Sequence, residues 1–263
     1  MSKLLAAIPA CHRHDYGGLE NASRVTNNEA LRMSALRDTW LKNCPADYRF
    51  FYGHGSGELK ADEVQLDVPD DYEHLPHKIR ESCRWALDHD YTHIYRVDND
   101  SYVYMDRLLK SGFEDHDYTG YCLDYPYHLE MHGHRYATGG AGFILNRRAM
   151  QIVIANEPTH PAEDLWIGRL LHQHGIRCHR DTRYLPAHDL HFIDLNQLPQ
   201  EHPYLALHAL TPDSMKDLHA RGYPGDDFTA PVKPLFEPDY PFGYGRKSKD
   251  CSCKYCNNGE LNG

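Results

Sequence analysis

Two aspartates, Asp98 and Asp100, lie two residues apart directly after a short apolar run, and this spacing suits the binding of a metal ion. The run, residues 94–97, predicts a buried strand that ends in the triplet Asp98-Asn99-Asp100. Charged groups at such a strand end are costly unless water, a metal or another cation receives them. Oxygen ligands suit Mg²⁺ or Mn²⁺, and two ligands from one loop leave positions for substrate phosphates. A solvated turn after an edge strand is the alternative, because a D-x-D pattern also occurs by chance.

A second acidic pair, Glu163 and Asp164, falls in the first turn of an expected helix that has Pro161 near its start and Gly175 at its end. Acids at a helix N-terminus complement the helix dipole even where they do no chemistry. The same dipole keeps a carboxylate ionised, so the pair also fits a general base that takes the proton of an acceptor hydroxyl. Sugar transfer with inversion needs one such base, and it needs no second acid where a metal stabilises the leaving diphosphate.

The elements that must position these acids follow from the hydrophobic pattern. Strands are expected at residues 4–8, 48–52, 64–68, 92–97, 118–121 and 142–145. Helices are expected at residues 26–43, which begin with a capping box, at residues 74–89, after Asn146 and after Pro161. Strands that alternate with helices predict one α/β domain with a mostly parallel sheet and helices on both faces. Ligands of such sheets bind beyond the carboxyl ends of the strands, where the Asp98-Asn99-Asp100 triplet lies.

The composition fits a folded protein and excludes some functions. Of the 263 residues, 41% are hydrophobic, which is enough for a core, and the formal net charge is −10. That charge argues against a bulk nucleic-acid partner, which needs a basic face, but leaves modified nucleic acid open as an acceptor. The apolar run at residues 4–9 is too short for a signal peptide, and no run reaches the length of a membrane span, so we expect a cytoplasmic protein without a membrane span.

Cysteine use is consistent with that expectation. Without a secretion signal, the dispersed cysteines are expected to be reduced. These are Cys11, Cys44, Cys83, Cys122 and Cys178.

The end of the chain differs in composition from the rest. Residues 223–263 are rich in proline, glycine and tyrosine, so we expect a C-terminal extension beyond a domain of residues 1–222. Cys251, Cys253 and Cys256 could bind Zn²⁺ with a fourth ligand from elsewhere, although their spacing is not that of a four-ligand knuckle. An exposed, reduced tail is the alternative.

Four segments, taken in order, resemble one enzyme family. They are "DDYEHLPHKI" (70–79), "YRVDNDSYV" (95–103), "GGAGFILNRRA" (139–149) and "EDLWIG" (163–168). Together they resemble the inverting β1,3-glycosyltransferases of the Fringe and core 1 galactosyltransferase family. The "LRDTW" of residues 36–40 is similar to the first helix of that family, and the resemblance covers about residues 3–210.

The resemblance implies a GT-A fold, which is a Rossmann-like, mostly parallel sheet flanked by helices, together with a UDP-sugar donor and Mn²⁺ or Mg²⁺. The D-x-D motif of the family falls on the triplet, so the resemblance implies that Asp100 binds the metal. Asp98 is expected near the metal, the ribose and the diphosphate. A late histidine that completes the metal site in many relatives falls on His208, although His202 and His219 lie nearby.

The remaining motifs carry further expectations. The acidic pair of the family falls on "EDLWIG", which makes Asp164 the expected catalytic base. Lys78 matches a donor-binding lysine, with a solvated helix residue as the alternative. Gly139 and Gly140 match a turn that approaches the donor sugar, since glycine permits close backbone approach. Trp166 could pack against the acceptor, but a helical tryptophan more often belongs to the core.

The leading hypothesis is therefore a metal-dependent inverting glycosyltransferase that moves a hexose-type sugar from a UDP-sugar to an acceptor hydroxyl. A metal-dependent phosphohydrolase acting on nucleotides is one alternative, but it gives the "GGAGF" and "EDLWIG" segments no role. A non-catalytic sugar-binding module of the same fold is another, but it would not need both Asp100 and Asp164. Animal relatives carry a membrane anchor and luminal disulfides, and neither is evident here, so a bacterial or viral cytoplasmic enzyme is favoured. The acceptor, whether glycan, lipid-linked sugar, protein or modified nucleic acid, stays open.

Overall fold

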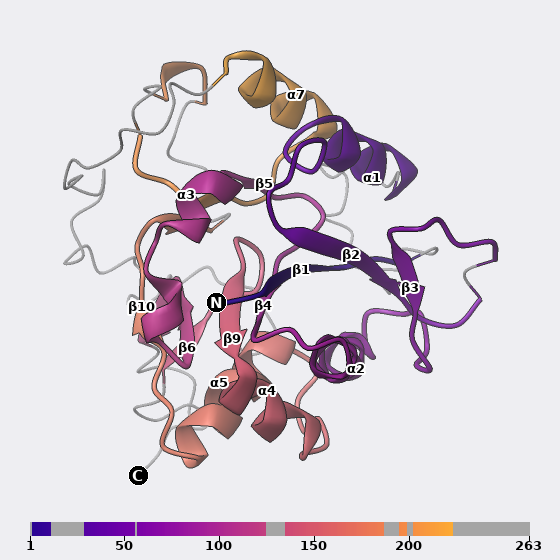
Figure 1. Cartoon of the computed structure of the whole chain (residues 1–263), viewed down its shortest axis with the longest axis vertical. Coiled ribbons are helices and arrows are strands. Elements are labelled where there is room, and N and C mark those ends of the chain that lie inside the picture. Colours follow the sequence, from indigo (N-terminus) through magenta and orange to yellow (C-terminus); the bar gives the residue numbers. More distant parts are fainter. Residues whose placement is uncertain are drawn as a thin grey trace, which may run out of the picture. The chain divides into compact units, whose positions relative to one another are not determined.

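A seven-stranded sheet forms the centre of the computed structural model, which describes residues 2–11, 29–55, 57–124, 135–186, 195–198 and 202–222 (Figure 1). Its strands are β1 (Leu4–Pro9), β2 (Asp47–Tyr52), β3 (Glu63–Gln65), β4 (His93–Arg96), β6 (Tyr118–Gly120), β9 (Phe143–Asn146) and β10 (His179–Arg180). They lie in the order β10-β6-β9-β4-β1-β2-β3. Only β9 runs antiparallel to its neighbours in this sheet, β4 and β6. The predicted fold class, a mostly parallel α/β sheet, is confirmed.

Strand β1 shows why the sheet is covered on both faces. All six of its residues are buried, as expected for a central parallel strand that reads as a continuous apolar run. Successive side chains of a strand point to opposite faces. Accordingly, Ala6 and Ile8 join one core cluster, and Leu5 and Ala7 join the other.

Helices cover both faces of the sheet (Figure 1). On one face lie α2 (Leu75–Asp88), α4 (Arg147–Ile154) and α5 (Glu163–Gln173). On the other lie α1 (Glu29–Asp38), α3 (Met105–Leu109) and α7 (Pro212–Ala220). Among the described residues, no helix combines the length and the apolar composition that crossing a membrane requires.

Several short elements complete the described part of the chain. A three-stranded sheet orders β11 (Tyr184–Leu185), β12 (Ala206–Leu207) and β5 (Tyr102–Val103). A hairpin pairs β7 (Cys122–Asp124) with β8 (Arg135–Ala137), and single 3₁₀ turns occupy Phe113–Asp115 and Leu195–Gln197. None of these elements was expected, because two- and three-residue strands are too short to show a hydrophobic period.

The longer predicted elements agree with the structure except at their ends. Helix α1 stops at Asp38 rather than near residue 43, and residues 39–43 form turns in which the buried Trp40 donates its indole N–H to the Ser101 carbonyl at 3.0 Å. Strand β3 ends at Gln65 rather than at residue 68. Most of the predicted capping box, residues 26–28, lies outside the described residues.

The cysteine expectation is wrong for two residues. Cys122 in β7 and Cys178, directly before β10, form a disulfide, and their Cα atoms lie 6.3 Å apart. The parallel pairing of β6 with β10 brings the two chain segments side by side, which no local pattern in the sequence indicates. Cys11, Cys44 and Cys83 are free thiols, as expected. Disulfides persist mainly in oxidising compartments, so this bond is at odds with the expected cytoplasmic location.

Reduction of this disulfide is expected to destabilise the fold. The bond joins residues 56 positions apart, and the chain-entropy model assigns a loop of that size about 4 kcal/mol of stabilisation. Urea unfolding with and without dithiothreitol measures the loss. The double variant Cys122→Ser/Cys178→Ser is the control, because its unfolding should not respond to the reductant. Unchanged unfolding of the parent, with both thiols open to alkylation before reduction, would show that the bond does not form.

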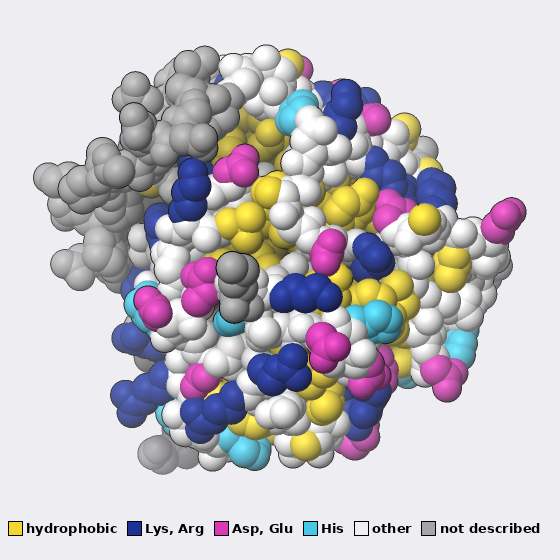
Figure 2. Space-filling view, viewed as in Figure 1, with side chains coloured by type: hydrophobic (Ala, Val, Ile, Leu, Met, Phe, Trp, Pro, Cys, Tyr) yellow, Lys and Arg dark blue, Asp and Glu magenta, His cyan; other side chains and the backbone are white. Residues whose placement is uncertain are grey.

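Charge and domain division complete the description of the fold. On the face drawn in Figure 2, basic and acidic side chains of the described residues lie interspersed rather than in a basic stripe.

The chain divides into residues Met1–Ala230 and Pro231–Gly263. The second unit, with Cys251, Cys253 and Cys256, lies outside the described residues. The expected C-terminal extension and its zinc site therefore stay predictions.

Candidate active site

A cavity of about 230 Å³ lies at the carboxyl ends of β1 and β4. This is the sheet edge at which open α/β sheets bind their ligands. Charged side chains from four stretches of the chain line the cavity. They are Arg32, Asp71, Lys78, Arg96, Asp98, Asp100, Glu163 and Asp164. The sequence-predicted acids Asp98, Asp100 and Asp164 therefore meet in one place, together with Lys78, Gly139 and Gly140.

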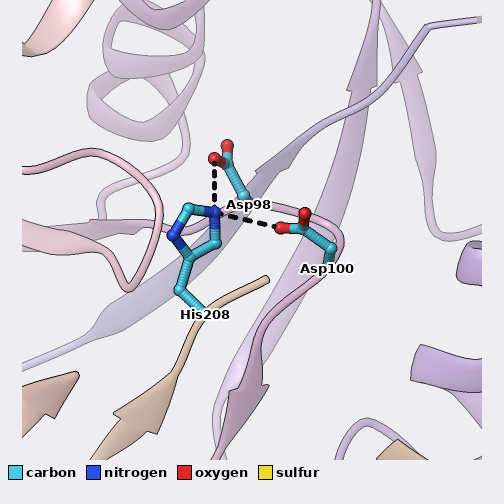
Figure 3. Close-up of side chains that lie close together, drawn as sticks. All are labelled: Asp98, Asp100 and His208. Carbon is cyan, nitrogen blue, oxygen red and sulfur yellow. Dashed lines mark ion pairs between the residues drawn. The ribbon is translucent and has the colours of Figure 1, made fainter. Parts of the chain in front are cut away.

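Asp98, Asp100 and His208 converge beside this cavity (Figure 3). One ligand atom of each lies within 4.8 Å of the others. His208 Nε2 is 3.3 Å from Asp100 Oδ1 and 3.6 Å from Asp98 Oδ2. The backbone explains the approach: β12 pairs antiparallel with β5, which follows the triplet, and the Leu210 N–H donates to the Asp100 carbonyl at 2.8 Å.

The geometry distinguishes His208 from the two neighbouring histidines. His202 is buried beside Tyr104 and Arg107, and its ring accepts or donates a hydrogen bond at 2.9 Å to the Tyr104 hydroxyl. His219 lies in α7, where its ring contacts the Tyr102 hydroxyl at 3.0 Å. Neither histidine belongs to the group of possible metal ligands that Asp98, Asp100 and His208 form.

The donor set fits a divalent cation. Asp100 Oδ1 is buried, and apart from its ion pair with His208 no described residue donates a hydrogen bond to it, so it retains capacity to bind a cation. Burial alone would raise the pKa of Asp100, but His208 and Arg32 lower it below its usual range, which keeps the carboxylate ionised. Burial would likewise lower the pKa of His208, but Asp100 and Asp98 raise it. Two carboxylates and one imidazole are ligands that Mn²⁺ accepts.

The position of the His208 ring requires a glycine at residue 140. A Cβ atom at Gly140 would collide with the His208 ring, and one at Gly139 would collide with Glu163 Oε1 and Arg96. Both glycines line the cavity, so their expected proximity to a donor sugar stays a prediction. Their immediate structural role is to admit these side chains to the cavity wall, since glycine has no Cβ.

Gly140→Ala is therefore expected to displace His208 and to weaken Mn²⁺ binding by about 10–100-fold, the effect typical of disturbing the support of a metal ligand. Calorimetric titration with Mn²⁺ measures the change. Gly139→Ala is the matched comparison, because its methyl group would meet Glu163 and Arg96 instead and should reduce Mn²⁺ affinity less. Equal Mn²⁺ affinity of Gly140→Ala and the parent protein would mean that His208 does not bind the ion.

Arg96 is the main residue that the sequence interpretation missed. Its side chain is buried, and it donates to Asp98 Oδ1 at 2.7 Å, to Glu163 Oε1 at 2.5 Å and to the Gly139 carbonyl at 2.6 Å. Burial would lower the pKa of Arg96, but the charges of Asp98 and Glu163 raise it. A charged residue inside an otherwise apolar strand was the available signal, because a buried cation needs partners.

Glu163 and Asp164 differ in their surroundings although they are adjacent in α5. Glu163 is 5% exposed and paired with Arg96; burial raises its pKa to about 7 against the opposing effect of that guanidinium. Asp164 accepts hydrogen bonds from the Leu165 N–H at 2.8 Å and the Gly139 N–H at 3.3 Å. Burial also raises the pKa of Asp164. Asp164 forms no ion pair with any residue that the structure describes, so its carboxylate, unlike that of Glu163, is not held by a cation.

Side chains in the first turn of α1 hold Asn99, the middle residue of the triplet. The sequence interpretation did not predict these contacts. Asn99 donates to Glu29 Oε1 at 2.6 Å and accepts from Arg32 Nη1 at 3.3 Å. Glu29 also accepts from the backbone N–H of Cys11 at 3.3 Å, at the end of β1. Arg32 is 4% exposed and lines the cavity, so a buried guanidinium lies beside the aspartate group.

Lys78 is not the solvated helix residue that was its alternative. Its buried ammonium group donates to Asp70 Oδ1 at 2.7 Å and to the Ala10 carbonyl at 2.6 Å. Asp70 also accepts from the Gly53 N–H at 2.8 Å, so the pair joins α2 to the ends of β1 and β2. Trp166 is 2% exposed and packs in the core, as its alternative reading expected.

Comparisons with known proteins give distant similarities. No protein-family profile matches the chain. A candidate nucleotide-diphospho-sugar transferase from Desulfovibrio desulfuricans G20 is 13% identical, with 69% of this chain and 80% of that chain covered and a TM-score of 0.45. The galactosyltransferase LgtC with donor and acceptor sugar analogues is 12% identical, covering 84% and 96%, with a TM-score of 0.45. CMP:2-keto-3-deoxy-manno-octonic acid synthetase with CTP is 11% identical, covering 84% and 98%, with a TM-score of 0.43.

Proposed function

We propose that the protein is a metal-dependent inverting glycosyltransferase of the GT-A type, related to the Fringe and core 1 galactosyltransferase family, that transfers a hexose-type sugar from a UDP-sugar to an acceptor hydroxyl. One observation carries the proposal. A single cavity is lined by Asp98 and Asp100, which form a group with His208, and by Asp164. Such an arrangement suits a reaction with a charged leaving group on one side and a hydroxyl nucleophile on the other.

The donor half of the cavity comprises the residues that would bind metal and diphosphate. Asp98, Asp100 and His208 would hold Mn²⁺ or Mg²⁺, which when bound neutralises the diphosphate as it leaves. Arg32 lies beside this group, and its guanidinium can pair with phosphate oxygens. Lys78 contributes through its bonds to Asp70 and Ala10, which fix the wall on which the nucleotide would rest.

The acceptor half depends on Asp164. In the proposed reaction, the acceptor oxygen forms a bond to the anomeric carbon while the bond from that carbon to the phosphate oxygen breaks. The hydroxyl proton passes to Asp164, which the Gly139 and Leu165 N–H groups orient. Attack opposite to the leaving group inverts the anomeric configuration. Glu163 is held by Arg96, and this favours Asp164 as the proton acceptor.

UDP binding is expected to require the metal, because the diphosphate and the aspartates would share one cation. Calorimetry with UDP, with Mn²⁺ and after EDTA treatment, measures this dependence. UMP in Mn²⁺ is the control ligand, since it keeps the uridine, lacks the diphosphate and should bind weakly. Equal UDP affinity with and without metal would contradict the proposed donor half.

A donor screen separates the proposal from its alternatives. The purified protein is incubated with UDP-, GDP- and dTDP-sugars and Mn²⁺, and released nucleotide and free phosphate are both followed. Release of UDP from one sugar nucleotide supports a glycosyltransferase. Phosphate release from simple nucleotides would instead indicate a phosphohydrolase, and binding without any turnover would indicate a sugar-binding module.

A further inference from the structure

Arg32 differs from the two other buried cations that line the cavity. Lys78 and Arg96 each pair with carboxylates at 2.7 Å or less. Arg32 is 4% exposed, yet it forms no ion pair with any residue that the structure describes. Its guanidinium offers several N–H donors, and within the described residues its hydrogen bond runs from Nη1 to the Asn99 side-chain oxygen at 3.3 Å. A buried cation whose donors are mostly unused has the capacity to bind an anion.

Glu29 lies about one helical turn before Arg32 in α1, at the spacing that lets opposite charges pair on a helix. The structure describes both side chains and gives no ion pair between them. Instead, the Asn99 amide nitrogen donates to Glu29 Oε1 at 2.6 Å, and its oxygen accepts from Arg32. The acid can only accept and the guanidinium can only donate, which fixes the orientation of the amide. Asn99 thus contacts both groups without neutralising the charge of Arg32.

These three side chains are fixed relative to the candidate metal ligands. Asn99 is 7% exposed and is the middle residue of the triplet. Glu29 also accepts from the Cys11 N–H at 3.3 Å, which joins α1 to the end of β1. Arg32 lines the same cavity as both aspartates of the triplet. The guanidinium therefore has a defined place beside the proposed cation site.

The charges in this part of the cavity suit an anion bound next to a cation. Asp98, Asp100 and His208 would hold a divalent ion, and a nucleoside diphosphate on that ion keeps negative charge that the ion does not neutralise. The guanidinium of Arg32 can pair with the phosphate oxygens. A carboxylate in place of the Asn99 amide would instead pair with Arg32 and would remove its positive charge from the site.

We propose that Asn99 is a positioning residue for donor binding: its neutral amide separates Glu29 from Arg32, and this leaves the charge of Arg32 for the phosphate groups of a nucleoside diphosphate. The inference rests on the proposed function and deepens it by assigning a role to the middle residue of the triplet. Asn99 acts through Arg32, so its effect should appear in diphosphate binding and not in metal binding.

A charge swap tests the inference without changing the net charge of the protein. In the double variant Glu29→Gln/Asn99→Asp, the carboxylate moves from α1 to the triplet, where it can pair with Arg32. Calorimetry on the full chain measures the affinity for Mn²⁺ alone and for UDP with Mn²⁺. We expect UDP affinity to fall about tenfold or more, the usual effect of losing a hydrogen bond to a charged group. Mn²⁺ affinity should stay the same or rise, because the moved charge is negative.

Single variants assign the effect to Arg32. Glu29→Gln alone should keep UDP affinity within about twofold, since the charge of Arg32 stays available. Arg32→Gln should lower UDP affinity about tenfold or more. Arg37→Gln is the matched control in the same helix, because Arg37 pairs with Asp62 and Glu63 and does not line the cavity. It should keep UDP affinity within about twofold.

A double-mutant cycle separates an effect through Arg32 from direct repulsion of UDP by the moved carboxylate. If the charge swap acts through Arg32, it should change UDP affinity by less than about threefold in an Arg32→Gln background. Direct repulsion would cost as much in that background as in the parent, or more, because no guanidinium offsets it. An equal or larger loss there would overturn the inference.

The remaining outcomes separate the inference from the proposed function. Unchanged UDP affinity of the charge swap, or of Arg32→Gln, in samples that bind Mn²⁺ overturns the inference and leaves the proposed function standing. If the charge swap does not fold, Asn99→Asp takes its place in the same comparisons. If UDP does not bind the unaltered protein in the presence of Mn²⁺, the proposed function itself fails.

Discussion

Asp164→Asn is expected to lower turnover by about 10²–10⁴-fold while UDP affinity in Mn²⁺ stays nearly unchanged. Asparagine has a single carbonyl oxygen, so it can keep the hydrogen bond from the Leu165 N–H at 2.8 Å, which lies in the first turn of α5, while the longer bond from the Gly139 N–H to the other carboxylate oxygen is lost. What is lost is the capacity to take the acceptor proton. The measurement is the rate of UDP release with the donor and acceptor found by screening, together with calorimetry for UDP.

Glu163→Gln is the matched comparison for this prediction. Glu163 is the adjacent acid, about 100° around the helix, and its carboxylate pairs with Arg96. Its replacement should be milder, because it alters the surroundings of Arg96 without removing the proposed base. Near-full turnover of Asp164→Asn alongside an inactive Glu163→Gln would reverse the assignment of the two acids.

Asp100→Asn should act on the other half of the cavity and reduce Mn²⁺ affinity by more than about 100-fold, because loss of a direct ligand exceeds the usual effect of disturbing its support. The buried Asp100 Oδ1 contacts His208 as an ion pair at 3.3 Å, and the negative charge is the property that the substitution removes. UDP binding should then no longer respond to Mn²⁺. Calorimetry with Mn²⁺ alone and with UDP plus Mn²⁺ gives both quantities.

Asp106→Asn controls for the loss of one negative charge. Asp106 lies in the first turn of α3, is exposed, and does not line the cavity. It should leave Mn²⁺ affinity within about twofold, as expected for a screened charge on the surface. Retention of tight Mn²⁺ binding by a folded Asp100→Asn protein would rule out the Asp98, Asp100 and His208 group as the metal site.

The sequence predicted the elements that have a clear hydrophobic pattern, either a continuous apolar run or apolar residues at helical spacing. The continuous apolar run of β1 and the helical spacing of Ile79 and Cys83 in α2 each reflect a repeating burial pattern, and each predicted element exists with its ends shifted by a few residues at most. The short strands β5 and β12 carry no such period. Their pairing brings His208 to Asp100, so the contact could be expected only from the family resemblance.

The same limit applies to the candidate site. Acids placed after a strand or at a helix start stand out in a sequence, and Asp98, Asp100 and Asp164 all line the cavity, while their chemical roles stay predictions. Arg96 lies within the apolar run of β4, and its charge was the one signal of a role in the site. The Cys122–Cys178 bond and the buried pair of Lys78 with Asp70 depend on which segments the fold brings together, which local patterns do not specify.

The bridging position of Arg96 has a consequence for binding equilibria. Its guanidinium contacts Asp98, in the proposed donor half, and Glu163, in the proposed acceptor half, at the same time. A change of charge at one carboxylate therefore alters the electrostatic free energy of the other. Thermodynamic linkage makes this effect reciprocal: any factor by which donor and cation change acceptor affinity is the factor by which acceptor changes theirs. Under the proposed function, a dissociation constant for donor, cation or acceptor therefore refers to stated concentrations of the other two.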